Sequence, residues 1–288
     1  MVYYGKGKVK KAISIYADAG MRKMMKVCSI ASGSSGNCTY IEDGSRRILV
    51  DAGISRKRIV EGLKQIGADP AKLDAIFVTH EHIDHIQGIP VLAHQFDIPI
   101  YATAGTLDGI RAKDSRGVIR MEQLFQIYPD QTVDMGSMHI TPYHISHDAA
   151  DPVGYLVESG GQKAGIATDL GYFDDYIVEY LEGSDILLLE ANHDISMLEA
   201  GPYPYQLKCR ILGERGHLSN EDSGRLLCRL MEAGLRHVFL AHLSKENNYP
   251  ELAYQAVKCQ IWEELGQKIL PFDMEVADRD QPSRLVTI

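Results

Sequence analysis

The sequence has few cysteines, no long apolar run and no excess of basic residues. Its five cysteines are scattered and form no C-x-x-C pair, which argues against a disulfide framework and against a thiolate metal site. We expect them to be small buried side chains in a reducing compartment, so the cytoplasm is the expected location. No run approaches the roughly 18 apolar residues of a membrane-spanning helix, and the N-terminus lacks the apolar core of a secretion signal.

The formal net charge of −9 argues against a protein that binds nucleic acid over much of its surface, because such proteins usually carry a basic face. Basic residues do gather locally, and we interpret these clusters first as solvated faces. They lie at residues 46–47, 56–58, 111–120 and 208–215. Any recognition of nucleic acid is therefore expected to be confined to a small part of the surface.

Composition is that of a globular protein with a sizeable core, since 45% of the residues are hydrophobic and 24% are charged. Residues 1–24 are polar, basic and poorly periodic, and we predict that they form a flexible N-terminal extension. Whether this extension belongs to the natural mature protein stays open. Residues 25–288 contain no internal repeat or linker, and we predict that they form a single domain.

Short strands alternate with helices along most of the chain. Apolar runs predict strands near 25–30, 38–42, 47–50, 75–78, 98–102, 154–157, 164–167, 185–189 and 237–241. Helical spacing and capping residues predict helices after Ser55, around Pro90 and over 174–181, 203–212, 219–231 and 251–265. Sites in α/β proteins gather at strand ends, and polar residues end these strands: Asp51, Thr79, His80, Asp169, Glu190 and His242.

One short run, Thr79 to His85, places three imidazoles and a carboxylate directly after an apolar strand. His80 and His82 are two apart in extended backbone and point the same way, whereas Asp84 and His85 can face a second point nearby. One run can therefore serve two metal ions. Imidazole and carboxylate ligands without thiolate suit zinc best, and manganese or iron is also compatible with them.

Four local ligands do not complete two coordination spheres, so distant ligands are needed. His147, Asp169 and His242 each follow an apolar run, which is how a rigid strand presents a ligand. His144 is a rival to His147, because it lies three residues earlier. The Ser-His-Asp-Ala context favours His147.

Asp51, the His80-x-His82-x-Asp84-His85 run, His147, Asp169 and His242 occur in the order of the five motifs of the metallo-β-lactamase fold superfamily, which the chain resembles over residues 25–265. The runs at 32–37, 190–194, 216–222 and 242–248 resemble the YycJ/WalJ group of that superfamily. The resemblance implies an αββα four-layer sandwich, in which two mixed β-sheets are flanked by helices.

The same resemblance implies a ligand set for two divalent ions. His80, His82 and His147 are expected on one ion, Asp84, His85 and His242 on the other, and Asp169 between them. Asp51 is expected behind the ligands, where it orders the histidine run.

Several residues outside the ligand set are candidates for substrate contact. His217 precedes a helix-capping pattern that favours an anion, so we expect it to contact a phosphate or donate a proton. His193 is a similar catalytic candidate. Further substrate contacts are expected from the glycine-rich turn and from the run after His242, at Ser34, Ser35, Asn37 and Asn247. The turn lacks P-loop spacing, which argues against a nucleotide P-loop.

These residues predict a dinuclear metal-dependent hydrolase in which a hydroxide bridging the two ions, oriented by Asp84 and Asp169, attacks the substrate. His82 favours hydrolysis over redox chemistry, because the di-iron relatives carry Glu at that place. The YycJ/WalJ resemblance implies a phosphodiester substrate, DNA, and a 5′-exonuclease-like activity.

Two alternatives stay open. One is hydrolysis of a carbon ester, thioester or lactone, as in glyoxalase II relatives. The other is a non-catalytic metal-binding regulator linked to cell-wall signalling. The native metal, the direction of digestion, the oligomeric state and the physiological pathway are not predicted from the sequence.

Overall fold

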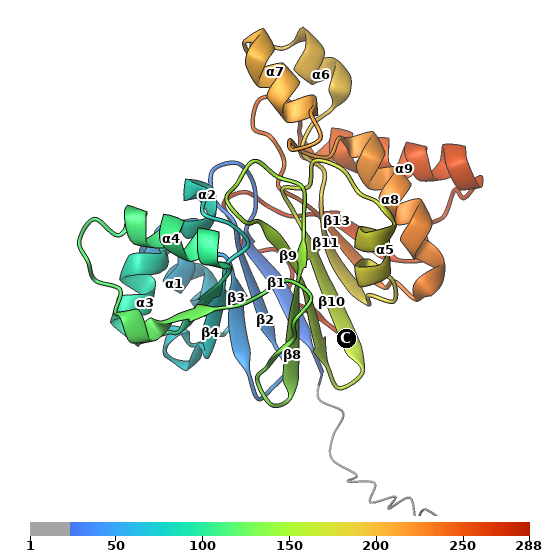
Figure 1. Cartoon of the computed structure of the whole chain (residues 1–288). Coiled ribbons are helices and arrows are strands. Elements are labelled where there is room, and N and C mark those ends of the chain that lie inside the picture. Colours follow the sequence, from blue (N-terminus) through green and yellow to red (C-terminus); the bar gives the residue numbers. More distant parts are fainter. Residues whose placement is uncertain (1–23) are drawn as a thin grey trace, which may run out of the picture.

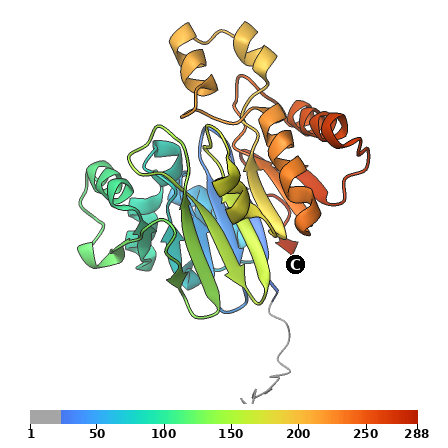
Figure 2. The same ribbon diagram turned by 45° about the vertical axis from the view of Figure 1, so that its right-hand side comes forward.

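The computed structural model describes residues 24–288 (Figure 1). All of the expected N-terminal extension except Met24 lies outside the described residues. Two seven-stranded sheets pack face to face, and helices cover the outer face of each sheet (Figures 1 and 2). The predicted αββα four-layer sandwich is confirmed. No helix between residues 24 and 288 is long and apolar enough to cross a membrane.

The first sheet has the strand order β14-β1-β2-β3-β4-β5-β6. Strands β1 to β3 form an antiparallel meander, and β3 to β6 run parallel to one another. The bounds are β1 Lys26–Ala31, β2 Cys38–Glu42, β3 Arg47–Val50, β4 Ala75–Phe77, β5 Ile100–Ala102, β6 Leu124–Gln126 and β14 Val286–Thr287. The last of these, β14, comes from the far end of the chain and pairs antiparallel with β1.

The second sheet has the strand order β13-β12-β11-β10-β9-β8-β7. Strands β7 to β10 are antiparallel, whereas β10 to β13 run parallel. The bounds are β7 Val133–Asp134, β8 Met138–His144, β9 Val153–Ser159, β10 Gln162–Ala167, β11 Ile186–Glu190, β12 His237–Ala241 and β13 Asp273–Val276.

Helices lie between the strands along the chain, and most of them pack on the outer faces of the two sheets. They are α1 Arg56–Gln65, α2 Ile83–Ile86, α3 Ile89–Phe96, α4 Ala104–Lys113, α5 Asp175–Leu181, α6 Ile195–Ala200, α7 Tyr205–Leu212, α8 Asn220–Leu230 and α9 Pro250–Leu265, with three short 3₁₀ turns at Pro70–Lys72, Met121–Gln123 and Met231–Ala233. Of these helices, α6 and α7 project beyond the sandwich (Figures 1 and 2). Ser55 caps α1 as predicted, since its hydroxyl accepts from the Arg58 N–H at 3.4 Å.

Some elements were absent from the prediction. The segment that forms α4 contains Gly105 and Gly109, which lower helix propensity. Its packing explains the second glycine, because a Cβ at position 109 would lie 2.3 Å from Cβ of Glu81. Strands β13 and β14 lack a clear apolar alternation, and form by pairing with the edges of the sheets.

The cysteine prediction was partly wrong. Cys28 and Cys38 are buried in the core as expected, but Cys209 and Cys259 are exposed. Both exposed residues lie on helices, α7 and α9, with their side chains on the outer surface. All five are free thiols.

The inner faces of the two sheets form one apolar layer. Alternate residues of β3 and β4 face residues of β9 across it, and Phe77 contacts Tyr155 edge-on with ring centres 5.7 Å apart. Burying a side chain of this size stabilises the fold by roughly 1.5–3 kcal/mol. Asp43 adds a polar link between the sheets, because its carboxylate accepts from the Ser159 hydroxyl at 2.7 Å.

The carboxyl ends of β3, β4, β8, β10, β11 and β12 all lie at one edge of the sandwich, as the parallel pairings and the two antiparallel pairs of β9 require. We call this the metal edge. Three polar residues just beyond these strands adopt left-handed backbone: Asp51 with φ 61°, Asp169 with φ 58° and His242 with φ 55°. Such conformations cost about 1–3 kcal/mol each and cluster at functional sites.

Candidate metal centre

The metal edge gathers the predicted ligands from both sheets. The loop after β4 provides His80 and His82, and the short helix α2 provides Asp84 and His85. His147, Asp169 and His242 follow strands of the second sheet. Gly53 allows the loop after β3 to approach the histidine run, because a Cβ at that position would lie 1.6 Å from the carbonyl oxygen of Asp84. The seam between the sheets therefore carries the site.

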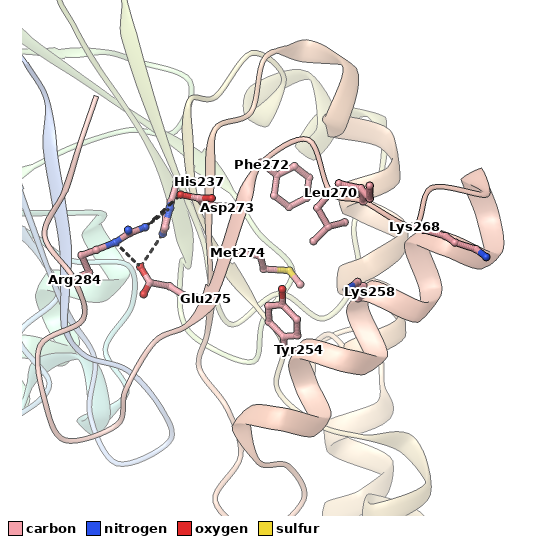
Figure 3. A pocket seen from close by; sticks show the side chains of 11 residues that line it. His237, Tyr254, Lys258, Lys268, Leu270, Phe272, Asp273, Met274, Glu275 and Arg284 are labelled. Carbon is pink, nitrogen blue, oxygen red and sulfur yellow. Dashed lines mark hydrogen bonds and ion pairs between the residues drawn. The ribbon is translucent and has the colours of Figure 1, made fainter.

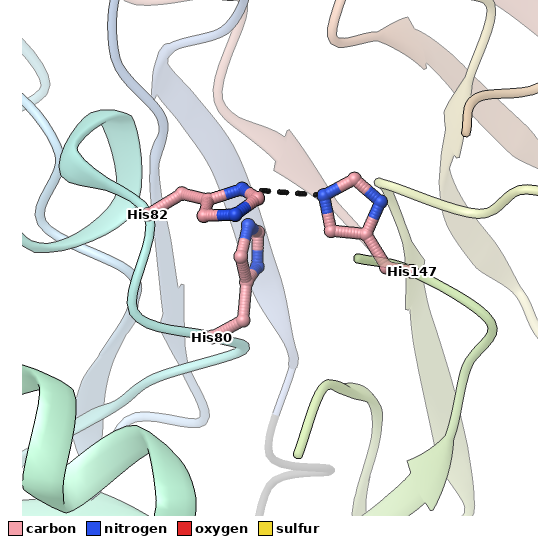
Figure 4. Close-up of side chains that lie close together, drawn as sticks. All are labelled: His80, His82 and His147. Atoms are coloured by element: carbon pink, nitrogen blue, oxygen red, sulfur yellow. Dashed lines mark hydrogen bonds between the residues drawn. The ribbon is translucent and has the colours of Figure 1, made fainter. Parts of the chain in front are cut away.

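His80, His82 and His147 form a first triad (Figure 4). Their ligand nitrogens all lie within 4.8 Å of one another, and Nδ1 of His82 is 3.3 Å from Nε2 of His147. His80 and His147 are buried, whereas the His82 side chain is 31% exposed. A solvent-facing member leaves room for a water or substrate beside the triad.

Asp84, His85 and His242 form a second triad. Oδ2 of Asp84 lies 3.6 Å from Nε2 of His85 and 3.5 Å from Nε2 of His242. Both imidazoles are buried, and the carboxylate is 20% exposed. These three ligand atoms converge on one point, as the first three do.

Asp169 lies between the two triads. Its Oδ2 atom is 3.2 Å from Nε2 of His85, and its Oδ1 atom is 3.7 Å from Nε2 of His147. One carboxylate therefore contacts a member of each triad. This is the arrangement that a carboxylate bridging two ions requires.

Acceptors behind the imidazoles fix which nitrogen faces the cluster. Nδ1 of His85 lies 2.8 Å from the carboxylate of Asp51, and Nδ1 of His147 lies 3.1 Å from the carbonyl oxygen of Gly216. Asp51 also accepts from the Thr79 N–H at 2.8 Å and from its hydroxyl at 2.9 Å. The hydroxyl oxygen of Thr79 is then free to accept from Nδ1 of His80 at 3.0 Å. Each imidazole is thus left with Nε2 directed to the cluster.

Glu190 is a central residue of the site that the predicted set of site residues omitted. It ends β11 after four apolar residues, and that carboxylate at the end of a buried strand was the available signal. Oε1 lies 2.8 Å from Nδ1 of His217 and 2.9 Å from Nδ1 of His242. Oε2 accepts from the backbone N–H groups of Leu170 and Leu218 at 2.7 and 3.2 Å.

The buried carboxylates and imidazoles shift one another's pKa values. Burial alone would raise the pKa of Asp169, but His242 and His85 outweigh it and hold that pKa well below its ordinary value. Burial would lower the pKa of His85, but Asp169, Asp51 and Asp84 raise it well above its ordinary value. Asp169 therefore stays ionised at neutral pH and favours positive charge on the imidazoles around it.

Glu190 and His217 show the same mutual effect. Burial opposes ionisation of Glu190, yet His217 and His242 lower its pKa to about 2. Glu190 in turn outweighs the burial of His217 and raises the pKa of that imidazole. The two side chains form a carboxylate–imidazole pair next to the triads, in which the charged form of each favours the charged form of the other.

The cluster fits divalent cations on its own chemistry. Within the described residues, the buried atoms Nε2 of His80 and Oδ2 of Asp169 have no hydrogen-bond partner, and each belongs to a group of possible metal ligands. Orphaned buried acceptors of this kind are costly unless a ligand satisfies them. The ligands are nitrogen and oxygen without thiolate, which suits zinc and also manganese or iron.

The glycine-rich turn at 32–37 lies against the second triad. Ser34 and Ser35 are exposed and can reach a substrate, but Asn37 is buried. The Asn37 amide accepts from the Gly33 N–H at 2.9 Å, and its nitrogen lies 3.1 Å from Nε2 of His85. Asn37 therefore holds the turn in place from behind it.

The structure buries two other candidates for substrate contact. Asn247 is fully buried, and its amide donates to the Ser244 hydroxyl at 3.4 Å. His193 is also buried, neither ring nitrogen has a partner among residues 24–288, and burial lowers its pKa to about 4. Neither side chain is open to solvent in this structure.

The remaining histidines lie away from the cluster. His144 faces solvent on β8, so the structure brings His147 and not His144 to the metal edge; His94 and His139 are exposed as well. His237 starts β12, at the opposite end of that strand from His242, and lines a hollow of about 570 Å³ (Figure 3). There Nε2 of His237 lies 2.9 Å from the carboxylate of Glu275, so this histidine has a structural partner.

Known proteins resemble the chain in sequence and in fold. A family described as "Beta-lactamase superfamily domain" matches residues 46–243. The chain is 39% identical over 236 residues to "Exodeoxyribonuclease WalJ" of Streptococcus pneumoniae serotype 2 (strain D39 / NCTC 7466), which covers 82% of this chain and 88% of the relative. It is 35% identical over 257 residues to "Exodeoxyribonuclease YycJ" of Bacillus anthracis, and this match covers 89% of this chain and 96% of the relative.

A solved structure shares the fold at low identity. The crystal structure of the metallo-beta-lactamase fold protein YhfI from Bacillus subtilis has a TM-score of 0.66 and 19% identity, and the match covers 90% of this chain and 99% of that chain. This likeness concerns the fold alone.

Proposed function

The chain belongs to the beta-lactamase superfamily and resembles its WalJ and YycJ exodeoxyribonucleases, and we propose that it removes nucleotides from an end of DNA by metal-dependent hydrolysis. The reaction class is that of a metal-dependent nuclease or phosphodiesterase. The substrate, the 5′ direction of digestion and the use of two ions are the finer parts of the proposal.

The two triads are the places for the ions. We assign His80, His82 and His147 to one ion, Asp84, His85 and His242 to the other, and Asp169 to both. When bound, divalent ions lower the pKa of a coordinated water and polarise a phosphoryl oxygen. Zinc fits this ligand set best, and manganese and iron are compatible with it.

Asp84 is the catalytic carboxylate of this proposal. Its partly exposed carboxylate lies at the mouth of the second triad, where it can accept a hydrogen bond from a water approaching the phosphate. Asp51 acts at a distance from the substrate. Its contacts with Thr79 and His85 hold the histidine run in its ligating shape.

The observation that carries the phosphodiester assignment is the pair of Glu190 and His217 beside the triads. Nδ1 of His217 is engaged by Glu190, so Nε2 is the nitrogen left for a substrate, and the side chain is 19% exposed. A carboxylate-backed imidazole can donate a proton to a leaving group. The sugar alkoxide that leaves from a phosphodiester is a poor leaving group and needs that proton.

The same pair weighs against a thioester substrate and against the regulator, whereas the alkoxide that leaves from a carbon ester or lactone needs the same proton, so those substrates are separated from DNA by the assay below. A thiolate leaves without protonation, so a thioester hydrolase has no need for an oriented acid at this place. A purely metal-binding regulator has no leaving group at all. The exposed Ser34 and Ser35 at the metal edge add hydroxyl donors that suit a phosphate oxygen.

We also propose a cytoplasmic location. Cys209 and Cys259 are exposed free thiols, which are typical of a reducing compartment.

The burial of two candidate residues changes their proposed roles. His193 and Asn247 are buried, and we propose that they support the loops that carry the site. Ser34 and Ser35 are exposed and stay the proposed substrate contacts.

A parallel assay tests the proposal. Duplex and single-stranded DNA labelled at either end, bis-p-nitrophenyl phosphate and a thioester are each incubated with the protein and added Mn²⁺ or Zn²⁺. We expect release of labelled mononucleotides from the 5′ end and hydrolysis of the phosphodiester, with no thioester turnover. Turnover of the thioester alone would overturn the proposal, and metal uptake without any turnover would favour the regulator.

A further inference from the structure

Residues 194–215 leave the metal edge and return to it, and we call this segment the arm. It starts after His193 and ends before His217, and it contains α6 and α7. Its two ends are joined at the base, where the Asn192 N–H donates to the Leu218 carbonyl at 3.0 Å and the Asn220 N–H donates to the His193 carbonyl at 2.9 Å. The arm is thus fixed to the segment that carries His217.

The arm stands away from both sheets. Figures 1 and 2 show α6 and α7 projecting beyond the edge of the sandwich, and no other helix covers them in either view. Helix α7 contains no buried residue. Burial of an apolar face against the rest of the chain therefore does not account for this helix.

The exposed face of α7 carries an aromatic ring and cations. Tyr205 is 81% exposed, and the helix has Lys208 and Arg210 but no acidic residue. Nζ of Lys208 donates to the backbone carbonyl of Glu199 at 2.6 Å. Since this partner is a neutral oxygen and not a carboxylate, the charge of Lys208 is left for an anion.

Two arginines connect the arm to the first triad. Arg215 donates to the carbonyl oxygen of the ligand His147 at 3.0 and 3.2 Å, again a neutral oxygen. Arg210 pairs with Asp148, which lies 3.5 Å from Nε2 of His147. By contrast, Arg225 and Arg229 on neighbouring α8 are paired with Asp222 and Asp175. Of these four arginines, Arg215 is the one without a carboxylate partner, and it lies on the arm beside the first triad.

Exposed tyrosines continue this surface along the metal edge. Tyr172, three residues after Asp169, is 45% exposed, and Tyr249, at the start of α9, is 50% exposed. Every nucleobase has a face that can stack on an aromatic ring, and a strand with stacked bases presents its phosphates to nearby cations. A single nucleic-acid strand satisfies both kinds of group on this surface.

We infer that the arm is a docking surface for single-stranded DNA, with Tyr205 stacking on a base and Lys208 and Arg215 contacting phosphates beside the metal centre. This inference rests on the proposed function and deepens it, because it assigns where the strand beyond the scissile phosphate lies. It also accounts for strand binding by a chain with a net charge of −9, since the contact is local.

The test compares the double variant Tyr205→Ala/Lys208→Glu with a matched control, Trp262→Ala/Lys268→Glu. Lys268 lies over the Trp262 ring at 5.2 Å, near the end of α9 that is remote from the metal edge. The measurements are the KM for a single-stranded oligonucleotide at several salt concentrations, the kcat for bis-p-nitrophenyl phosphate, and the melting temperature of each variant.

We expect the arm variant to raise the KM for the oligonucleotide by about tenfold or more, because one stacked base and one phosphate contact are lost. The KM of the arm variant for the oligonucleotide should depend less steeply on salt concentration than the wild-type KM does. Its kcat for bis-p-nitrophenyl phosphate and its melting temperature should stay at the wild-type values. The control variant keeps the wild-type KM.

Two outcomes overturn the inference, and they differ in what they say of the enzyme. If the arm variant digests the oligonucleotide with the wild-type or control KM, the inference fails and the proposed function stands. If the wild-type protein hydrolyses neither substrate, the proposed function fails and the inference falls with it.

Discussion

Glu190 and His217 meet at 2.8 Å between Oε1 and Nδ1, at the seam between the two sheets. The two oxygens of Glu190 contact four groups, namely two backbone N–H donors and the imidazoles of His217 and His242. These contacts hold the carboxylate in one orientation. His217 takes its orientation from this fixed carboxylate. The pair therefore links the metal centre to the group proposed to donate a proton.

The role of His217 as a proton donor is tested by the leaving group. We expect His217→Ala to lower kcat on DNA by about 10²–10⁴-fold, because the alkoxide must leave without its proton. Hydrolysis of bis-p-nitrophenyl phosphate should fall far less, because p-nitrophenolate is stable as an anion. His144→Ala, at an exposed histidine of β8, is the control for both substrates. Equal losses on DNA and on the activated ester would contradict the assignment.

Loss of a ligand should remove activity without unfolding the chain. Asp84→Ala and His82→Ala change partly exposed side chains at the mouth of the site, so we expect hydrolysis to be abolished while the melting temperature of the metal-free protein, measured in chelator, changes little. Elemental analysis should show fewer bound ions per chain than in the wild type. Retained turnover in either variant would exclude that residue from the ligand set.

Asp51 should affect metal affinity without touching the substrate. In Asp51→Asn the amide keeps the shape but loses the charge that orients His85, so we expect the metal affinity to fall by about 10–100-fold. Competition with a chromogenic chelator measures this affinity. Saturating metal should restore much of the activity, and activity that stays low at saturation would assign Asp51 a different role.

Chelation should destabilise the protein, because an ion bound at the seam stabilises the folded state that contains both triads. An ion present at 100 times its dissociation constant contributes about 2.7 kcal/mol. We therefore expect the melting temperature to fall on addition of chelator and to recover with Zn²⁺ or Mn²⁺. His80→Ala, which lacks a ligand of the first triad, should respond less. A wild-type melting temperature that chelator leaves unchanged would argue against ions at this seam.

Asp43 provides a pH dependence that is independent of the metal centre. Its carboxylate accepts from the Ser45 and Arg46 N–H groups and from Ser159; burial opposes ionisation, but these hydrogen bonds prevail and lower its pKa. A carboxyl whose pKa is lowered by folding stabilises the protein above its ordinary pKa, and this stabilisation is lost as the pH falls through the folded-state pKa.

We expect Asp43→Asn to lower the free energy of unfolding by about 1–3 kcal/mol at pH 7, since a charged acceptor is lost between the sheets. The difference from the wild type should shrink as the pH falls below about 4. Urea unfolding at pH 7, 5 and 3.5 measures it. A difference that is the same at all three values would show that ionisation of Asp43 contributes nothing.

The clustering of the predicted ligands could be anticipated because each of these residues follows an apolar strand in a recognisable run. Glu190 shares that position at the end of β11, but one carboxylate without a nearby histidine in sequence carries no ligand pattern. Its partner His217 is 27 residues away, and the hydrogen bonds that join the two ends of the arm, between Asn192 and Leu218 and between Asn220 and His193, bring them together.

Burial was the least predictable property of the site. The sequence predicted Asn37 and Asn247 to be polar loop residues that contact the substrate, but the packing of the loops buries both side chains. The left-handed backbone of Asp169 and His242 is equally invisible in sequence, because neither residue is a glycine. Both properties come from tertiary contacts between loops of different strands.

The pairing of β14 with β1 sets the order in which the sandwich can be completed during synthesis. β1 lies near the start of the described chain, but its neighbour in the sheet consists of Val286 and Thr287. As the ribosome delivers the chain from its N-terminus, one side of β1 stays without its partner until residues 286–287, which follow every other strand of the two sheets, have emerged. An open strand edge can pair with other chains, so the nascent protein is exposed to misassembly until β14 arrives.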